Sequence, residues 1–248
     1  MNSLPLIFLH GFPFNSSCWD SQISYFGEKM KILAPDLRGH GKAPTPKGPW
    51  MIADFAADLK ELMDANKIER ANICGLSMGG YIALQFTEQF PNCVGKLILC
   101  DTRADADSNE AKDKRHAALQ KIRKDGLSQF AKDFSQSVLS ESTIKTNPNL
   151  QSSVEKMILG NNPESVMMTL GALASRRDSI PFLEAIDRPT LVIVGSDDRV
   201  TPPEVNESIA KKVKGAQFRI IDKAGHLSNL EQPASFNACL ESFLLKDV

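Results

Sequence analysis

Six short segments of almost continuously apolar residues constrain the fold of this chain more than any other feature. They read LPLIFLHG, KILAPDLRGHG, ANICGLS, KLILCDT, TLVIVGS and QFRIID in chain order. A strand with one solvated face alternates between apolar and polar residues, and these segments do not alternate. They therefore predict strands that are buried on both faces, as in a parallel sheet covered by helices.

Amphipathic stretches with helical spacing separate these segments. Residues 52–66 repeat apolar side chains on one helical face, residues 78–90 continue directly from the third segment, and residues 233–245 follow the sixth. The alternation of strand and helix predicts an α/β fold, with a doubly wound, mostly parallel sheet.

One long segment breaks this alternation. Residues 103–184 contain no strand-like run, and they are far longer than a crossover between two strands requires. Asn162 followed by Pro163 is typical of a helix start within this segment. One apolar helical face is formed by Leu127, Phe130, Ala131, Phe134 and Val138. We therefore expect residues 1–102 and 185–248 to form the core, with residues 103–184 inserted as a helical lid over the carboxyl ends of the strands.

The bulk properties exclude several function classes. The 248-residue chain has a net charge of −1 and no long basic run, which argues against nucleic acid or an anionic membrane as its main partner. Its five cysteines are scattered without a Cys-x-x-Cys pair, so we expect reduced thiols and a cytoplasmic protein. No apolar run approaches the ~20 residues of a membrane span, and the run near Met1 is too short for a signal peptide. The oligomeric state is left open by these properties.

Candidate site residues follow the ends of the six apolar segments. Ligands of doubly wound sheets bind beyond the carboxyl ends of the strands, and all of these residues should lie at that edge. In chain order they are His10, Gly11, Asp36, Arg38, Ser77, Asp101, Asp197, Asp198 and His226.

Ser77 is surrounded by glycines in the segment GLSMGG, between a predicted strand and a predicted helix. Gly75 and Gly79 would allow the close backbone approach that a sharp strand-to-helix turn needs. The pattern Gly-x-Ser-x-Gly is short, and it also fits a tight turn capped by a serine. Its place between strand and helix, with a histidine later in the chain, favours a nucleophile that attacks a carbonyl carbon.

Five motifs together resemble the α/β-hydrolase family over nearly the whole chain. They are LHGF, DLRGHGKA, GLSMGG, GSDDRVTPP and AGHLSNLEQP, in the family's order. The resemblance implies a nucleophile, an acid and a histidine in that chain order. It implies Ser77 as the nucleophile and His226 as the base. In the family pattern Gly-x-x-Asp-x-x-x-Pro, Gly195 and Pro202 select Asp198 as the acid.

Elimination among the four histidines also favours His226 as the residue that takes the serine proton and returns it to the leaving group. His116 lies in a charged helical stretch. His40 is interpreted as structural, and His10 belongs to the motif before the oxyanion loop.

The acid is the least constrained member of the set. Asp198 would hold the imidazole tautomer and stabilise the imidazolium. Asp197 is better explained as a turn or solvent-exposed residue. Asp101 stays an alternative, because some relatives carry the acid after that strand.

The resemblance also implies an oxyanion hole made of two backbone N–H groups. One would come from Met78, which follows the nucleophile at a helix N-terminus. By motif position the other would come from Phe12, whose side chain could alternatively do no more than pack under the lid.

Three arginines are candidate ligands for a substrate carboxylate. Arg38 lies in a motif where relatives usually show a structural role, and Arg176 and Arg177 fit a solvated helix face better. The histidines and cysteines lack the spacing of metal ligands. No Gly-x-Gly-x-x-Gly follows a strand, so we expect neither a metal nor a nucleotide cofactor.

The motifs and the lid look most like the subgroup near carboxylesterases and 3-oxoadipate enol-lactonases. That resemblance implies a serine hydrolase that cleaves small carboxylic esters or lactones through an acyl-enzyme. Carbon–carbon bond hydrolases and perhydrolases of the same fold are alternatives, and so is a ligand-binding relative that has lost catalysis. Haloalkane dehalogenases are disfavoured, because they carry an aspartate at the position of Ser77.

Overall fold

The computed structural model describes residues 4–245 and contains a six-stranded sheet in which every neighbouring pair of strands is parallel. The strand order across the sheet is β2-β1-β3-β4-β5-β6. The strands are β1 (Leu6–Leu9), β2 (Ile32–Leu33), β3 (Ala71–Leu76), β4 (Val94–Cys100), β5 (Thr190–Gly195) and β6 (Gln217–Ile221). Each of the six apolar segments contains or overlaps one of these strands, so the predicted parallel α/β sheet is confirmed.

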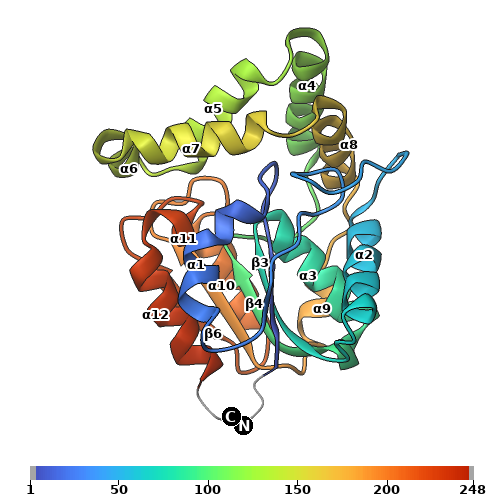
Figure 1. Ribbon diagram of the computed structural model, residues 1–248, viewed down its shortest axis with the longest axis vertical. Coiled ribbons are helices and arrows are strands. Elements are labelled where there is room, and N and C mark those ends of the chain that lie inside the picture. The colour runs from blue at the N-terminus through green and yellow to red at the C-terminus, as the bar shows by residue number, and fades with distance from the viewer. Residues whose placement is uncertain (1–3, 246–248) are drawn as a thin grey trace.

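Helices cover both faces of the sheet and form a separate core on each (Figure 1). In β1, Leu6 and Phe8 point into one core, whereas Ile7 and Leu9 point into the other. The helices α1 (Asp20–Phe26) and α12 (Pro233–Leu244) contribute to the first core. The second core is shared with α2 (Ile52–Ala65), α3 (Met78–Gln89) and α10 (Pro203–Lys212). Shorter elements are η1 (Ser16–Trp19), η2 (Pro91–Cys93) and α11 (Ser228–Glu231).

The expectation that all six strands are buried on both faces is wrong at the two edges of the sheet. The two residues of β2 are only half-buried. In β6, Arg219 and Ile220 are exposed, and Ile220 is 53% accessible. An edge strand has a neighbour on one side only, and a charged residue such as Arg219 discourages pairing with another chain there.

Between β4 and β5 the chain forms helices only. They are α4 (Asn109–Asp125), α5 (Ser128–Val138), α6 (Glu141–Thr146), α7 (Pro148–Leu159), α8 (Pro163–Ala174) and α9 (Ile180–Leu183). Figure 1 shows α4 to α8 as a layer above the sheet, whereas α9 lies lower, beside the sheet. The predicted start of α8 is confirmed, because the Asn162 side chain accepts a hydrogen bond from the Glu164 N–H at 2.8 Å and Pro163 is the first helical residue.

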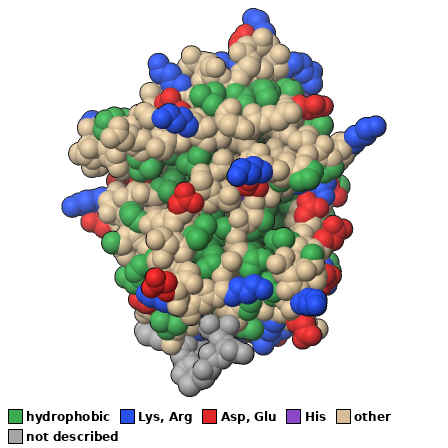
Figure 2. Space-filling model, viewed as in Figure 1, with side chains coloured by type: hydrophobic (Ala, Val, Ile, Leu, Met, Phe, Trp, Pro, Cys, Tyr) green, Lys and Arg blue, Asp and Glu red, His purple; other side chains and the backbone are tan. Residues whose placement is uncertain are grey.

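The carboxyl ends of the strands face this helical layer. Phe12, which follows β1, packs edge-to-face against Phe130 and Phe134 of α5, with ring centroids 6.3 and 5.9 Å apart. On the face drawn in Figure 2, Lys and Arg side chains are interspersed with Asp and Glu rather than gathered in one patch. Within residues 4–245, no helix is both long and apolar enough to span a bilayer.

Candidate active site

The parallel register brings the ends of four strands to one place. Leu9 pairs with Gly75, Gly75 pairs with Leu99, and Cys100 pairs with Ile193. Residues that follow these positions therefore leave the sheet at the same edge. The candidate residues that follow β1, β3, β4 and β5 meet there, and the loop after β6 joins them.

Ser77 occupies a sharp turn between β3 and α3. Its backbone has φ +52° and ψ −111°, a combination that is rare for a residue with a side chain. The turn is held by the Ser77 N–H, which donates to the Cys100 carbonyl at 2.9 Å, and by the Thr102 hydroxyl, which donates to the Ser77 carbonyl at 2.8 Å. Ser77 is half-buried at the N-terminus of α3.

The glycines around Ser77 are required by close backbone contacts. A Cβ atom on Gly75 would lie 2.2 Å from the Gly79 carbonyl oxygen, and a Cβ on Gly79 would lie 2.2 Å from the Leu9 carbonyl oxygen. Both distances are far below van der Waals contact, so a side chain cannot be accommodated without moving the backbone. This confirms the steric role that the sequence predicts for Gly75 and Gly79.

Ser77, His226 and Asp198 form a continuous hydrogen-bonded chain. The His226 Nε2 atom lies 2.8 Å from the Ser77 Oγ, and the His226 Nδ1 atom lies 2.8 Å from the Asp198 Oδ2. With Nδ1 protonated toward the Asp198 carboxylate, Nε2 is the acceptor that faces the serine hydroxyl. His226 and Asp198 are both buried.

The Asp198 carboxylate is held in its ionised form by the loop after β5. Its Oδ1 accepts hydrogen bonds from the N–H groups of Val200 and Thr201, and its Oδ2 accepts one from the Thr201 hydroxyl at 2.7 Å. Burial alone would raise the pKa of Asp198. The His226 ring and these hydrogen bonds outweigh burial and hold the pKa below its ordinary value.

The electrostatic environment of His226 favours its protonated form. Burial lowers the pKa of the imidazole, but the Asp198 charge and hydrogen bond outweigh it, so the pKa lies above the ordinary value of 6.5.

Thr201 also contacts this site, although the sequence alone does not predict it. Its hydroxyl lies 2.7 Å from the Asp198 Oδ2 and 3.2 Å from the His226 Nδ1, and its place in the motif GSDDRVTPP is the only signal that pointed to it.

Asp101, the alternative acid, has other partners. Its Oδ1 accepts from the Gly195 N–H at 2.8 Å, and its Oδ2 accepts from the Ser228 hydroxyl at 2.5 Å. Burial raises the pKa of this carboxyl well above its usual range, and the nearby Asp198 charge raises it further. The hydrogen bond to the imidazole is therefore made by Asp198 and not by Asp101. Asp197 is exposed, as predicted for a turn residue.

The two predicted oxyanion donors belong to Met78, which follows Ser77 directly, and to Phe12, in the loop after β1. Met78 is the first residue of α3, where an N–H has no partner within its helix. A Cβ atom on Gly11 would lie 3.3 Å from the Ser77 Cβ, so the loop that contains Phe12 touches the serine. Within residues 4–245, no hydrogen bond uses the Phe12 N–H. The Phe12 side chain packs under α5. The two interpretations of Phe12, as an oxyanion donor and as a packing residue, are therefore compatible.

The other histidines are placed outside this chain of contacts. His10 is buried, its Nε2 accepts from the Leu37 N–H at 3.0 Å, and its Nδ1 lies 2.9 Å from the Gly11 carbonyl. Burial lowers the pKa of His10 to about 3 and that of His40 to about 4, so both rings are neutral. His116 is exposed on α4, as predicted. His10 therefore fixes the start of the loop that contains Phe12 against the loop after β2.

The prediction that Arg176 lies on a solvated helix face is wrong. Arg176 is buried, stacks on the Tyr81 ring at 4.5 Å and forms an ion pair with Asp107, which also binds Arg115. The Arg176 charge is therefore paired within the protein. Because Asp107 precedes α4 and Arg176 follows α8, this ion pair lies at the base of the helical layer. Arg177 is exposed and pairs with Glu88.

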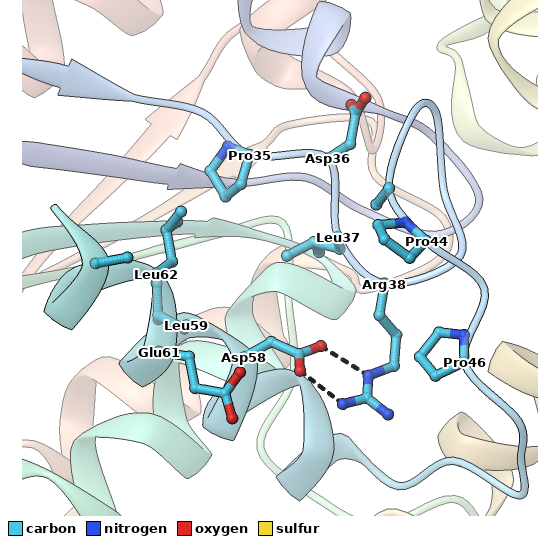
Figure 3. A pocket seen from close by; sticks show the side chains of 12 residues that line it. Pro35, Asp36, Leu37, Arg38, Pro44, Pro46, Asp58, Leu59, Glu61 and Leu62 are labelled. Atoms are coloured by element: carbon cyan, nitrogen blue, oxygen red, sulfur yellow. Dashed lines mark hydrogen bonds and ion pairs between the residues drawn. The ribbon is translucent and has the colours of Figure 1, made fainter.

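Arg38 lines a surface groove of about 460 Å³ between the loop after β2 and helix α2 (Figure 3). Its guanidinium binds the Asp58 carboxylate through two hydrogen bonds of 2.7 and 2.6 Å, which raise the pKa of Arg38. The groove is lined by Pro35, Asp36, Leu37, Arg38, Ala43, Pro44, Pro46, Asp58, Leu59, Glu61, Leu62 and Ala65. Ser77 and His226 are not among these residues, so the groove is separate from the candidate active site.

In the part of the chain that the structure describes, no cluster of three His, Cys, Asp or Glu side chains could hold a metal ion.

Comparison with known proteins gives a consistent result. Residues 5–233 match the family model described as the alpha/beta hydrolase fold. The chain is 30% identical to 3-oxoadipate enol-lactonase 2 of Acinetobacter baylyi, over 96% of this chain and 88% of that protein. It superposes on a thermophilic esterase from Thermogutta terrifontis, solved with malate bound, with a TM-score of 0.95 and 34% identity, covering 98% of this chain and 90% of the other. It also superposes on the enol-lactonase from Burkholderia xenovorans with a TM-score of 0.92 and 27% identity, covering 99% and 93%.

Proposed function

The chain belongs to the alpha/beta hydrolase fold family, and from this premise we propose that it is a serine hydrolase that cleaves small carboxylic esters or lactones through an acyl-enzyme. The observation that carries the proposal is the chain of two 2.8 Å contacts from Ser77 through His226 to Asp198. A serine hydroxyl is a weak nucleophile at neutral pH, and a histidine oriented by a carboxylate is the arrangement that activates it.

In the proposed mechanism, the Ser77 oxygen attacks the ester carbonyl carbon while its proton moves to the His226 Nε2. Asp198 keeps the imidazole in the required tautomer and stabilises the imidazolium, and the N–H groups of Phe12 and Met78 donate to the oxyanion. Collapse of the tetrahedral intermediate expels the alcohol, which takes the proton from His226. A water molecule then repeats the sequence on the acyl-enzyme, releases the acid and restores Ser77.

We also propose that residues 103–184 act as a lid on the core formed by residues 1–102 and 185–248. Support comes from α5, whose Phe130 and Phe134 rings contact Phe12 directly above the proposed oxyanion loop. Apolar side chains in this position exclude water from the acyl-enzyme and limit the size of the acyl group.

The named relatives favour esters and lactones over other substrates. One relative is named as a 3-oxoadipate enol-lactonase, and one similar structure is that of an esterase. Carbon–carbon bond hydrolases and perhydrolases would use the same three residues, so substrate assays must separate them. A non-catalytic binding relative is disfavoured, because such proteins often lack the histidine or the acid.

The test is a substrate panel on the purified protein. It contains p-nitrophenyl esters of increasing acyl length, an enol-lactone, a carbon–carbon bond substrate such as a vinylogous 1,5-diketone, and peracid formation from acetate and hydrogen peroxide. We expect turnover of short esters or the lactone that depends on Ser77. Turnover confined to the diketone or to peracid formation would assign the protein to the corresponding alternative class.

A further inference from the structure

Three hydrogen bonds connect the loop that carries His226 to the helical layer, one of them directly and two through the carboxylate of Glu231. The His226 N–H donates to the Val138 carbonyl at 2.8 Å. The carboxylate of Glu231, in the short helix α11, accepts the other two. Its Oε1 accepts from the Gly225 N–H at 2.8 Å, and its Oε2 accepts from the Ser140 N–H at 2.9 Å. A single carboxylate therefore joins the residue before His226 to the N-terminus of α6.

The backbones on the two sides of this carboxylate are in direct contact. A Cβ atom on Gly225 would lie 2.6 Å from the Ser140 nitrogen and 2.8 Å from the Leu139 carbonyl carbon. Gly225 is therefore a residue whose missing side chain allows the histidine loop to reach the helical layer. The contact buries Gly225 and leaves Glu231 half-buried.

The loop that carries Asp198 is attached to the same place. Arg199 follows Asp198 directly, and its guanidinium donates to the carbonyl groups of Leu139 and Gln136 at 3.2 and 3.4 Å and to the Glu141 carboxylate at 3.3 Å. We call residues 136–141, which run from the last turn of α5 to the first residue of α6, the lid foot. In Figure 1 this connection lies above α11, close to the loops after β5 and β6.

We propose that Glu231 is a positioning residue for the proposed base His226. By holding the histidine loop on the lid foot, it keeps the imidazole in line with both Ser77 and Asp198, so that proton transfer depends on the seating of the helical layer. This inference rests on the proposed function. Glu231 acts through the backbone of the loop and through its charge, and not by contact with the substrate.

The charges of three carboxylates from different elements act on His226. Asp198 comes from the loop after β5, Asp101 from the end of β4, and Glu231 from α11. Each raises the pKa of His226, while burial lowers it. Arg199, the cation in the neighbouring loop, is exposed and paired with Glu141. Removing the Glu231 charge should therefore lower the pKa of His226, an effect that a purely structural contact would not have.

The test compares Glu231→Gln with the wild-type protein on p-nitrophenyl acetate. The amide oxygen can keep one of the two hydrogen bonds, whereas the NH₂ group faces an N–H donor and the charge is lost. We expect kcat to fall about tenfold to a hundredfold, as for a displaced catalytic group, with KM changed less than about twofold. The acidic limb of the kcat/KM profile should move to lower pH.

Two further variants make the result interpretable. Glu61→Gln removes the same charge from the exposed surface of α2 and should leave both kcat and the acidic limb unchanged. Glu231→Ala removes both hydrogen bonds and should lose more activity than Glu231→Gln. Circular dichroism and thermal unfolding identify any variant that does not fold, and if the alanine variant fails to fold, Glu231→Gln alone decides.

The outcomes separate this inference from the proposed function. If wild-type protein is active and folded Glu231→Gln keeps its kcat and its acidic limb, the positioning role is wrong while the proposed function stands. If wild-type protein neither hydrolyses any ester or lactone nor reacts with a fluorophosphonate, the proposed function is wrong and the inference that rests on it falls too.

Discussion

The Nε2 atom of His226 lies 2.8 Å from the Oγ atom of Ser77, although the two residues are 149 positions apart in the sequence. Ser77 follows β3 and His226 follows β6, and the strands β4 and β5 lie between these two in the sheet. The histidine loop therefore has to reach across two strands at the carboxyl edge. The hydrogen bonds that attach this loop to the lid foot hold it in that position.

Asp198 is the predicted acid, and its replacement by asparagine should be severe. In Asp198→Asn the amide can present its NH₂ group to the His226 Nδ1, which favours the wrong imidazole tautomer. We expect kcat on p-nitrophenyl acetate to fall roughly 10⁴-fold, the order found when such an acid is replaced. Steady-state kinetics on the folded variant measures this loss, and nearly full turnover would remove Asp198 from the proposed mechanism.

Asp101 should behave in the opposite way. In Asp101→Asn the amide oxygen can accept from the Gly195 N–H while its NH₂ group donates to the Ser228 hydroxyl, so turnover should stay close to wild type. A variant that loses activity, while Asp198→Asn keeps it, would identify Asp101 as the acid.

The same variant should change the pH dependence of stability. Burial raises the pKa of Asp101 in the folded protein above its ordinary value of 3.8. The stability contributed by this group is therefore fully present below pH 3.8 and is lost as the pH rises through the folded-state pKa. Asp101→Asn should raise the free energy of unfolding more at pH 8 than at pH 5, as measured by denaturant titration. An equal effect at both pH values would show that the carboxyl does not titrate in this way.

The pH profile of kcat/KM should reflect His226. The imidazole must be neutral to accept the serine proton, and its pKa lies above the ordinary value of 6.5. Activity should therefore rise with pH through a midpoint above 6.5. The measurement is an initial-rate series with a substrate whose own ionisation is constant in this range. A midpoint below 6.5 would contradict the environment described for His226.

A matched pair of glycine substitutions in helices tests the close packing beside Ser77. Gly79→Ala places a Cβ atom 2.2 Å from the Leu9 carbonyl oxygen. We therefore expect the free energy of unfolding to fall by about 3 kcal/mol or more. Gly171→Ala in α8 meets no atom within 4 Å and should gain about 0.5–1 kcal/mol. Chemical denaturation of both variants measures the difference, and equal stability would contradict the close contact between α3 and β1.

The strands were predictable because burial on both faces leaves a signal in each strand's own residues. The apolar runs that contain β1, β3, β4 and β5 carry this signal directly. The same kind of run also predicts the edge strands β2 and β6. It does not predict their exposure, because exposure depends on the strand order in the sheet. Strand order is a relation between distant segments, and no single run records it.

The candidate site was predictable only as far as its motifs extend. Short motifs predict Ser77, His226 and Asp198, but only the side-chain contacts show that Asp198 and not Asp101 binds the imidazole. Arg176 was misjudged, because its burial depends on Asp107 and Tyr81, which pack against it only in the folded chain. Glu231 was missed for the same reason, since its partners Gly225 and Ser140 lie in two separate parts of the sequence.

The most direct test of the central claim is covalent labelling with a fluorophosphonate, which reacts with an activated serine. The wild-type protein should be labelled, and mass spectrometry should locate the adduct on Ser77. Ser77→Ala and His226→Ala should take no label while folded, and Ser208→Ala, on the exposed surface of α10, should be labelled like wild type. Folded wild-type protein that stays unlabelled, or an adduct on another residue, would contradict the proposal that Ser77 is the nucleophile of a serine hydrolase.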